Sequence, residues 1–539
     1  MGPDRSFFAR FASFTIALPV AAAALFFPHD RALALQVTRG PYLQLATPGS
    51  ITIRWRTDLP ATSQVRYGDA PDALSTAVAD TTHTTEHQVT VTGLDPDRRY
   101  SYAIGSDAAV LAGGDAAHSF RTAPEPETHT RTRLWVIGDS GTADANAAAV
   151  RDAFVSYARG EPPDVWLMLG DNAYSSGTDG EYQAAVFDMY PEQLANTVLW
   201  PTRGNHDSSN DYFGVFTLPA AGEAGGVPSG TESYYSFDHG AVHFICLDSW
   251  ASDRSPTGPM ATWLRADLAA TDADWVIAYW HHPPYSKGSH DSDNPSDSGG
   301  RMKDMRENFV PILEDGHADL VLCGHCHAYE RSYLLHGHYG VSSTFNDQMK
   351  VNGGNGREDG DGCYCKTRIR SVSRGTVYVE AGCSGSARGG TLDHPAMAVS
   401  LNQLGSMVID IDGVRLDARF IDVHGTVLDQ FTIAKSSKLM ARPSPRERGP
   451  RIVFTGPGQP PAAAMFQYSL PAPGRTRLSV YGVDGRRVIG LRDEAQSAGD
   501  HRAEWDGRDD GGHRVPPGVY FAELRWQNDR RVVRIVKLD

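Results

Sequence analysis

The chain has 539 residues, too many for one compact core and enough for three or four domains. With 40% hydrophobic and 21% charged residues it has an ordinary globular composition, which excludes a disordered or collagen-like chain. After residue 34 no apolar run approaches the ~20 residues that span a bilayer, and the net charge of −15 argues against a nucleic-acid partner. These features predict a multidomain globular protein.

Residues 1–34 have the pattern of an export signal. Arg5 and Arg10 precede an apolar stretch over residues 11–27, and a small-x-small cleavage pattern ends at Ala34. The alternative is a buried first helix or a membrane anchor, but two prolines interrupt or end the run. We therefore expect a secreted or periplasmic protein that has no integral membrane segment after signal removal.

Residues 36–122 consist of short runs in which apolar and polar side chains alternate, separated by turn residues. Examples are residues 51–55, 88–91 and 99–104. This alternation predicts an all-β sandwich. Within it, residues 93–100 resemble the turn and following tyrosine of a fibronectin type III module.

Residues 131–435 change to apolar β-runs that alternate with helical stretches, which is typical of a layered α/β domain. Residues 123–130 read as the linker before it, and the Pro/Arg/Gly-rich residues 436–461 as the linker after it. Residues 462–539 return to short strands and turns, and they resemble the immunoglobulin-like (Ig-like) β-sandwich modules appended to many secreted bacterial enzymes. This tail is net basic behind an acidic body, so we expect a separate module.

Five apolar runs of the α/β segment end in polar clusters rich in metal-binding side chains. Because the carboxyl ends of strands in such sheets converge, short loops there can direct ligands into one crevice. Carboxylates, an amide oxygen and imidazoles together suit a pair of transition metals. A single such cluster is more often a turn or a helix cap, whereas five in one domain predict a metal centre. The clusters are Gly138-Asp139-Ser140-Gly141, Gly170-Asp171-Asn172-Ala173-Tyr174, Gly204-Asn205-His206-Asp207, His281-His282-Pro283-Pro284-Tyr285 and Gly324-His325-Cys326-His327.

The order and content of these clusters resemble the metallophosphoesterase (calcineurin-like phosphoesterase) superfamily and, within it, the purple acid phosphatases. The narrower resemblance rests on Tyr174, three residues after Asp171, and on the Gly-His-x-His-Ala-Tyr-Glu-Arg run at residues 324–331. Residues 40–44, Gly-Pro-Tyr-Leu-Gln, resemble part of the β-domain that precedes the catalytic domain in plant-type members. The resemblance covers residues 36–435 and implies a four-layer α/β metallophosphoesterase sandwich behind a fibronectin III-like domain.

The resemblance also implies a binuclear metal site. In this family the first metal is Fe(III), whose bond to tyrosinate gives the purple colour, and the second is Zn, Mn or Fe(II). Phenolate and carboxylate ligands suit the harder ion, and imidazoles with an amide suit the divalent one. Carried over by motif, the first metal takes Asp139, Tyr174 and His327, the second takes Asn205, His281 and His325, and Asp171 bridges the two.

The implied activity is that of an acid phosphatase, in which metal-activated hydroxide attacks a small phosphate monoester. His206 matches the family's histidine that contacts phosphate. His290, nine residues after His281, falls near the family's proposed general acid, and His282 and Tyr285 are the alternatives for pocket roles. A phosphodiesterase or a nucleotidase with the same site is the alternative activity.

Two other classes of protein fit the sequence less well. A secreted adhesion or scaffold protein would contain an inactive hydrolase domain, yet here every expected ligand position is filled. Residues 138–141 superficially match the nucleophile motif of trypsin-like proteases, but the interval between His118 and Ser140 is too short to hold the paired barrels that such a triad requires. We expect the C-terminal module to serve cell-surface attachment, sorting or substrate proximity, not catalysis.

The six cysteines leave two interpretations open. In an exported chain they are compatible with disulfides, including a local bridge among Cys363, Cys365 and Cys383. Cys323 and Cys326 form a C-x-x-C, which in isolation suggests a redox or zinc site. The position of Cys326 between two candidate ligands favours a packed small side chain instead.

Three further features also have two interpretations. The Gly- and Asp-rich residues 352–362 suit calcium binding or, more simply, a solvated loop. His394 either edges the pocket or belongs to a structural turn. Asp207 and Arg331 either support the ligands or serve ordinary capping and pairing.

Overall fold

The structure is a computed structural model. The expected export signal over residues 1–34 and the linker over 436–461 lie almost wholly outside the residues that it describes. Within the described part of the chain, no helix has both the length and the hydropathy needed to cross a membrane. The described residues are 34–368, 373–436, 451–454, 464–470, 473–497, 499–527 and 529–537.

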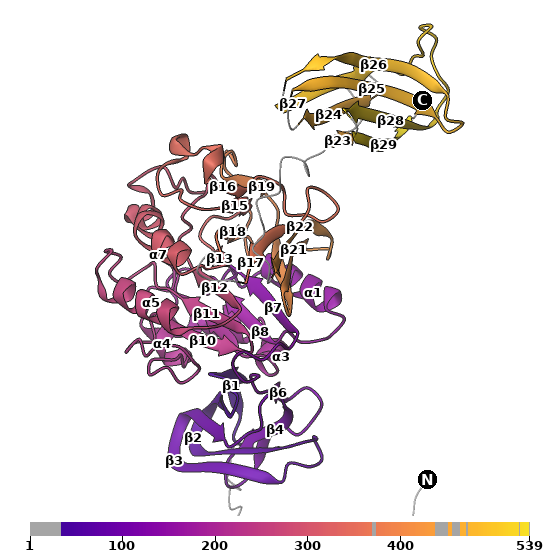
Figure 1. Cartoon of the computed structure of the whole chain (residues 1–539). Helices are drawn as coiled ribbons and strands as arrows, with labels where there is room; N and C mark the ends of the chain where they lie inside the picture. The colour runs from indigo at the N-terminus through magenta and orange to yellow at the C-terminus, as the bar shows by residue number, and fades with distance from the viewer. Residues whose placement is uncertain are drawn as a thin grey trace, which may run out of the picture.

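The N-terminal segment forms a six-stranded antiparallel sheet (Figure 1). Its long second strand pairs with β1, β3 and β4. The hydroxyl of Tyr100 accepts a hydrogen bond from the backbone N–H of Asp95 at 2.9 Å, which closes the expected turn. The strands are β1 Val37–Gln44, β2 Ser50–Gly68, β3 Thr76–Thr92, β4 Arg99–Gly105, β5 Val110–Gly113 and β6 Ser119–Arg121.

This sheet packs directly on the central part of the chain. The Tyr42 hydroxyl donates to the carbonyl of Val215 at 2.9 Å, and the Tyr102 hydroxyl donates to the carbonyl of Ala195 at 2.9 Å. Tyr42 is also buried, and it belongs to the same hydrophobic cluster as the central strands. The segment 40–44 is therefore part of an interdomain contact.

Two seven-stranded sheets make up the central part of the chain. In the first, the order is β17-β22-β21-β20-β7-β8-β9, and β7, β8 and β9 run parallel. Their apolar runs, such as Leu134 to Ile137, are fully buried, as expected for parallel strands covered on both faces. The strands are β7 Thr132–Ile137, β8 Val165–Met168, β9 Leu199–Pro201, β17 Tyr364–Thr367, β20 Gly405–Asp412, β21 Arg415–Asp422 and β22 Val427–Ser436.

The second sheet has the order β10-β11-β12-β13-β18-β14-β19, with β11, β12, β13 and β18 parallel. The short strands β15 Leu334–Leu335 and β16 Lys350–Asn352 pair separately. The seven strands are β10 Tyr235–His239, β11 Val242–Cys246, β12 Trp275–Trp280, β13 Leu320–Cys323, β14 Tyr329–Ser332, β18 Val377–Ala381 and β19 Met397–Leu401.

Alternation along β12 shows how the layers are arranged. Ile277 and Tyr279 join the hydrophobic cluster shared with the first sheet, whereas Val276 and Ala278 join a second cluster that contains helix side chains. One face of this sheet therefore meets the other sheet, and its opposite face is covered by α5 Pro259–Ala270 and α7 Val310–Asp315, whose apolar side chains belong to the second cluster. Helix α1, Ala145–Tyr157, packs on β20 and β21 of the first sheet. The shorter α-helices are α2 Asp179–Tyr182, α3 Pro191–Leu194, α4 Asp211–Val215 and α6 Arg301–Asp304.

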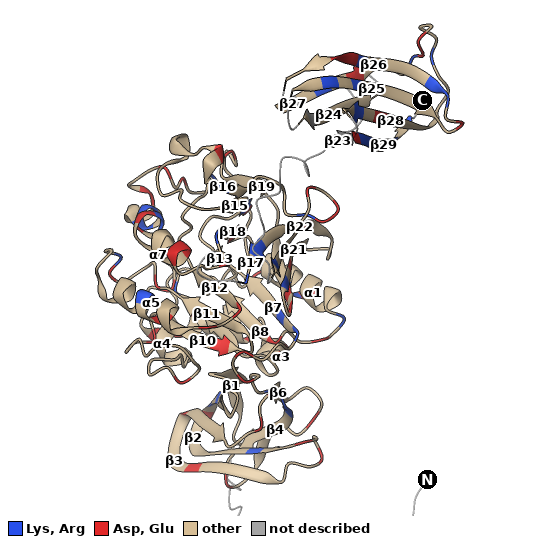
Figure 2. Cartoon of the chain, viewed as in Figure 1, with Lys and Arg blue, Asp and Glu red and all other residues tan. Residues whose placement is uncertain are grey.

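The C-terminal strands form two further sheets, β23-β24-β27 and β26-β25-β28-β29, with a hydrophobic core of their own. Leu478, Trp505 and Ala522 are buried in this core. Figure 2 shows basic and acidic residues interspersed along these strands, and Arg475 and Arg477 both pair with Asp493. The strands are β23 Arg451–Phe454, β24 Ala464–Leu470, β25 Gly474–Gly482, β26 Arg487–Gln496, β27 Gly499–Trp505, β28 Gly518–Trp526 and β29 Asp529–Lys537.

Candidate metal centre

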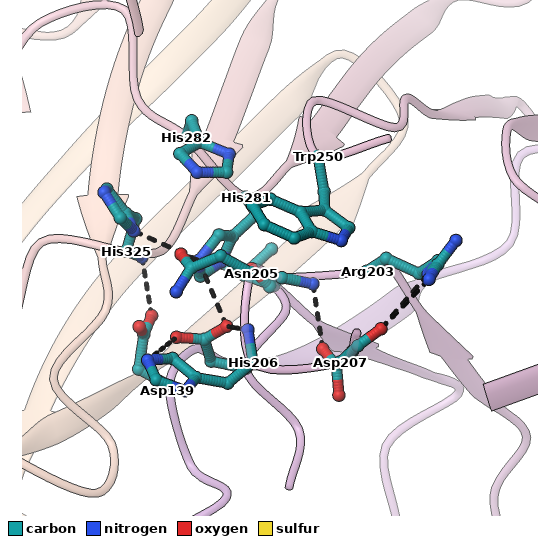
Figure 3. Close-up of polar contacts among 12 residues, drawn as sticks. Asp139, Arg203, Asn205, His206, Asp207, Trp250, His281, His282 and His325 are labelled. Atoms are coloured by element: carbon teal, nitrogen blue, oxygen red, sulfur yellow. Dashed lines mark hydrogen bonds and ion pairs between the residues drawn. The ribbon is translucent and has the colours of Figure 1, made fainter. Parts of the chain in front are cut away.

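The five polar clusters come together at the carboxyl ends of strands from both central sheets. Asp139 follows β7, Asp171 follows β8 and Asn205 follows β9 in the first sheet. His281 follows β12 and His325 follows β13 in the second sheet. Because the two sheets pack face to face, these loops converge on one site (Figure 3).

Three candidate ligands form one compact set of donor atoms. The Tyr174 hydroxyl lies 3.3 Å from Asp139 Oδ1 and 3.4 Å from His327 Nε2. His327 Nε2 lies 3.4 Å from the same Asp139 oxygen. Ligands at about 2.0–2.2 Å from one ion stand roughly 3.0–3.5 Å apart, so this triangle has the dimensions of a metal site.

A second set is centred on His281. Its Nε2 atom lies 3.1 Å from Asn205 Oδ1, 3.2 Å from His325 Nδ1 and 3.4 Å from Asp171 Oδ1. Ligand atoms of Asp139, Asp171 and His281 all lie within 4.8 Å of one another, so Asp171 stands between the two sets. The donors therefore fit two ions that share one carboxylate.

The electrostatics of the site also suit cations. Burial raises the pKa of Asp171; His281 opposes that rise, while the Asp139 charge adds to it. Burial, together with the charges of Asp139 and Asp171, raises the pKa of the Tyr174 phenol far above its usual range. Burial, with neighbouring histidines, lowers the pKa of His325 well below its usual range, which keeps its imidazole neutral. Buried anions that disfavour one another, next to a neutral imidazole, are stabilised by a bound metal ion.

The backbone at three candidate ligands is in the left-handed region. The φ angles are 54° at Asp139, 52° at Asp171 and 77° at His325. Such angles are uncommon outside glycine, and strained residues cluster at functional sites. The strand-end turns thus direct these side chains into the site at a local conformational cost.

Two glycines of the clusters lie so close to candidate ligands from other loops that no side chain fits at their positions. A Cβ atom on Gly204 would stand 2.1 Å from Asp171 Oδ1, and one on Gly170 would stand 2.6 Å from His281 Nδ1. Any side chain at these positions would displace a candidate ligand. These two glycines therefore belong to the geometry of the centre.

Hydrogen bonds hold the ligands in place. Nδ1 of His281 bonds to the carbonyl oxygen of Leu169 at 2.9 Å, which fixes the tautomer and leaves Nε2 for a metal. The backbone N–H of His325 donates to Asp139 Oδ2 at 2.7 Å, and that of His206 donates to Asp171 Oδ1 at 2.8 Å. Each carboxylate is thus tied to a neighbouring cluster.

Asp207, whose role the sequence leaves open, connects two loops that carry candidate ligands. Its buried carboxylate accepts hydrogen bonds from the backbone N–H of Gly204 at 2.8 Å and the Tyr182 hydroxyl at 2.7 Å. It also accepts from the backbone and side-chain N–H groups of Asn172. Burial raises the pKa of Asp207 to about 6. The sequence assigns no role to Tyr182, or to Asn172, which belongs to the Asp171 cluster.

His206 lies at the open side of the first set. Its ring meets the Tyr174 ring edge-on, with centroids 4.7 Å apart, and its Nε2 is 4.0 Å from Asp171 Oδ2. Nδ1 of His206 bonds to the carbonyl of Ser175 at 2.7 Å, and 41% of the side chain is exposed. His206 is therefore available to a ligand that enters from solvent.

His290 lies against the second set. Its ring stacks on the His325 ring at a centroid distance of 4.1 Å, and its Nδ1 lies 2.9 Å from Asp297 Oδ1. Ser298 Oγ lies 2.6 Å from His325 Nε2 and donates to Asp297 at 2.8 Å. Asp297 and Ser298 thus hold both histidines. Neither residue is predicted from the sequence, because no periodic pattern marks this irregular segment.

The two alternatives to His290 are less accessible. His282 is buried, its Nδ1 lies 2.9 Å from Ser249 Oγ, and burial lowers its pKa well below the usual range. Tyr285 is buried, and its hydroxyl donates to the carbonyl of His338. The half-exposed His290 is the better placed of the three to meet a substrate.

The cysteines lie outside the candidate ligand groups of the described residues. Cys323 and Cys326 are buried, as the packed interpretation expects. All six thiols are free, so the local bridge considered for Cys363, Cys365 and Cys383 is absent. The Sγ atoms of Cys363 and Cys365 nevertheless lie 3.4 Å apart.

The remaining ambiguous features have structural partners. His394 is buried beside Tyr285, with ring centroids 5.7 Å apart. Within residues 352–362, Glu358 pairs with Arg415 and Asp359 pairs with Arg357, which fits a solvated loop. The partner of Arg331 is a buried carboxylate, Asp429.

Comparisons with known proteins agree with this geometry. Residues 132–329 match the calcineurin-like phosphoesterase family, residues 38–122 match the purple acid phosphatase N-terminal domain, and residues 456–529 match the FlgD Ig-like domain. The chain thus has an N-terminal purple acid phosphatase domain, a central metallophosphoesterase domain and a C-terminal Ig-like domain.

Curated relatives and a solved structure point the same way. Purple acid phosphatase 23 of Arabidopsis thaliana is 30% identical over 280 residues, covering 46% of this chain and 57% of that protein. Purple acid phosphatase 15 of the same plant is 28% identical over 282 residues, covering 46% of this chain and 49% of that protein. The match thus spans about half the length of these relatives. The fold is similar to that of purple acid phosphatase PPD1 from yellow lupin (Lupinus luteus) seeds, with a TM-score of 0.57, 17% identity, and coverage of 74% and 75% of the two chains. The chain resembles the purple acid phosphatases of the calcineurin-like phosphoesterase superfamily.

Proposed function

We propose that this purple acid phosphatase-like chain is a secreted acid phosphatase that hydrolyses small phosphate monoesters at a binuclear metal centre. The observation that carries the proposal is the pair of donor sets, with neighbouring donors 3.1–3.4 Å apart, that share Asp171. The domain plan that goes with it is an export signal over 1–34, β-sandwiches over 36–122 and 462–539, and a four-layer α/β sandwich over 131–435.

The residues present fit the metals that the family implies. Asp139, Tyr174 and His327 would hold Fe(III), because carboxylate and phenolate suit the harder ion. Asn205, His281 and His325 would hold Zn, Mn or Fe(II), and Asp171 would bridge. When bound, such a pair supplies Lewis-acid polarisation of a phosphoryl oxygen and lowers the pKa of water.

The chain's own side chains supply the remaining chemistry. We assign His206 to contact with the substrate phosphate, because it is half exposed beside Tyr174 and Asp171. We assign His290 to protonation of the leaving alkoxide, because Asp297 fixes its Nδ1 and leaves Nε2 to hold the proton. The stack of His290 on His325 places that proton beside the second donor set.

The test of substrate class is a panel of phosphomonoesters, phosphodiesters and nucleotides offered to the metal-loaded protein. The proposal expects the highest kcat/KM among the monoesters. Faster cleavage of diesters or nucleotides would instead establish the alternative activity. Absence of turnover together with absence of bound metal would favour a scaffold protein.

Tyr174→Phe should bleach the visible absorption of the iron-loaded, oxidised protein. The phenolate oxygen that would give the charge-transfer band is removed, while the aromatic ring keeps its contact with His206. Visible spectra of both proteins at equal iron content provide the measurement. A wild-type protein that binds iron but shows no such band would contradict the assignment of Tyr174.

Removal of residues 440–539 should leave kcat/KM within about twofold of that of the full chain. All proposed ligands lie between Asp139 and His327, and the C-terminal sheets have a hydrophobic core of their own. The measurement is kcat/KM on a small phosphomonoester at two salt concentrations, because electrostatic contact with the basic tail is screened beyond about 8–10 Å. A loss beyond about tenfold at both salts, with metal content intact, would mean that the tail helps to build the active site.

A further inference from the structure

An open cavity of about 830 Å³ lies beside the metal centre, and none of the steps above uses it. One wall is the loop of residues 250–256, which begins four residues after β11. The other wall contains Arg301 and Asp304 of α6, together with Asn308.

Two chains of contacts connect this cavity to a candidate metal ligand. The Trp250 ring is nearly parallel to the His282 ring at a centroid distance of 6.4 Å, and the His282 ring is 4.4 Å from that of His325. On the other wall, Arg301 Nη1 donates to the carbonyl of Ser298 at 2.7 Å, and Ser298 Oγ lies 2.6 Å from His325 Nε2. Figure 3 draws Trp250, His282 and His325 in one close-up. The cavity wall is therefore separated from a candidate metal ligand by a single residue along each chain of contacts.

The walls are held in a fixed arrangement. The buried Asp248 carboxylate accepts hydrogen bonds from the backbone N–H groups of Trp250 at 2.8 Å and Ser252 at 3.0 Å. Arg301 Nε donates to the carbonyl of Trp250 at 3.1 Å, and its guanidinium lies 4.2 Å from the centroid of the Trp250 ring. The arginine is thus pre-organised by an aromatic face and two carbonyls, before any ligand arrives.

Arg301 has carboxylates nearby but forms no ion pair of its own within the described part of the chain. Among the described residues, no carboxylate forms an ion pair with Arg301, whereas its neighbour Arg254 pairs with Asp304 at 3.3 Å. Burial and the charge of Arg254 lower the pKa of Arg301, and the charges of Asp248 and Asp304 oppose that shift. The other acidic side chain of the cavity, Asp253, accepts hydrogen bonds from Ser255. The cavity therefore contains one guanidinium that forms no ion pair among the described residues, and a second one nearby.

We propose that this cavity binds a second phosphate group of the substrate, through Arg301 and Arg254, and that the enzyme prefers small molecules that carry two phosphates. This inference rests on the proposed phosphatase activity. A phosphate accepts the paired N–H donors of a guanidinium and carries up to two negative charges, which matches two neighbouring arginines. In this proposal Arg301 contacts the anion directly, and Arg254 attracts it from across the cavity.

The experiment compares fructose 1,6-bisphosphate with fructose 6-phosphate as substrates of the metal-loaded full chain. We expect a kcat/KM at least about tenfold higher for the bisphosphate in the wild type, and a fall of about tenfold in that ratio in Arg301→Gln, the effect of losing one charge-assisted hydrogen bond. Metal content of the variant is measured alongside. Arg254→Gln should lower the same ratio less, because Asp304 already neutralises that arginine.

Lys303→Gln is the matched control. It removes one positive charge from the same helix, but Lys303 pairs with Glu307 and does not line the cavity. The control should keep the wild-type ratio. Equal kcat/KM for both sugars in the wild type, or an unchanged ratio in both arginine variants, would overturn the second-phosphate site while leaving the phosphatase activity intact.

Failure of the proposed function is distinguishable, because the wild type would then hydrolyse neither ester. In that case the anion site is tested by calorimetric titration, which measures the affinity of the same proteins for fructose 1,6-bisphosphate. Weaker binding to Arg301→Gln than to wild type and Lys303→Gln would support the anion site, and equal affinity for all three proteins would overturn it.

Discussion

Asp171→Asn should lower kcat/KM for a phosphomonoester by at least about 10³-fold, because a neutral amide is a poor bridge between two cations and the site loses ~4 kcal/mol or more of charge stabilisation. Asp171 is the carboxylate that stands between the two donor sets. Its Oδ1 also accepts the backbone N–H of His206 at 2.8 Å, a bond that an amide oxygen can keep. The loss should therefore fall on metal binding and turnover, not on folding.

The measurement pairs steady-state kinetics with metal analysis of the purified variant. Asp152→Asn is the matched control, since Asp152 lies on α1 with 65% of its side chain exposed, and its kinetics should equal those of wild type. Near-wild-type turnover by Asp171→Asn with two metal ions per chain would remove the bridging role.

Asp429→Asn should lower the free energy of unfolding by about 3–5 kcal/mol, because it leaves the Arg331 guanidinium buried without its counterion. Both side chains are buried, and Asp429 accepts from Arg331 Nε at 2.6 Å and from the Tyr329 hydroxyl at 2.8 Å. Arg331 and Tyr329 belong to β14 of one sheet, and Asp429 belongs to β22 of the other. The pair therefore ties the two central sheets together.

Chemical denaturation, followed by the near-UV signal of the central aromatic core, measures this loss. Asp359→Asn removes the exposed partner of Arg357 in the same part of the chain, and a change below about 1 kcal/mol is expected there. If Asp429→Asn does not fold, the double variant Arg331→Met/Asp429→Leu should restore a folded protein, because it removes both charges. Equal effects of Asp429→Asn and Asp359→Asn would contradict the account.

The general fold and the resemblance to the family could be predicted from the sequence, because the motifs at the strand ends are characteristic of both. Asp139 and Asp171 each follow an apolar β-run, and a glycine precedes both. The hydrophobic pattern of the strands and the turn residues that follow them mark such positions in the sequence, even where the partner strands are unknown. The domain boundaries and the roles of individual ligands remain predictions.

The surroundings of the site were not predictable, because they depend on contacts between irregular segments. Ser298 and Arg301 come from a segment in which Ser298 has a φ of 53°, and no repeat connects it to Trp250. Arg331 could not be matched to Asp429, because the two residues lie 98 positions apart on strands of different sheets. Pair contacts of this kind follow from the packing of the sheets and are not visible in local patterns.

The most direct test of the binuclear proposal is to count metal ions in the purified chain while following hydrolysis of one phosphomonoester through metal removal and reloading. The account predicts two ions per chain, loss of turnover when a chelator removes them, and recovery when iron and a divalent metal are returned. Full turnover by metal-free protein, or a protein that binds two ions and hydrolyses no phosphate ester, would contradict it.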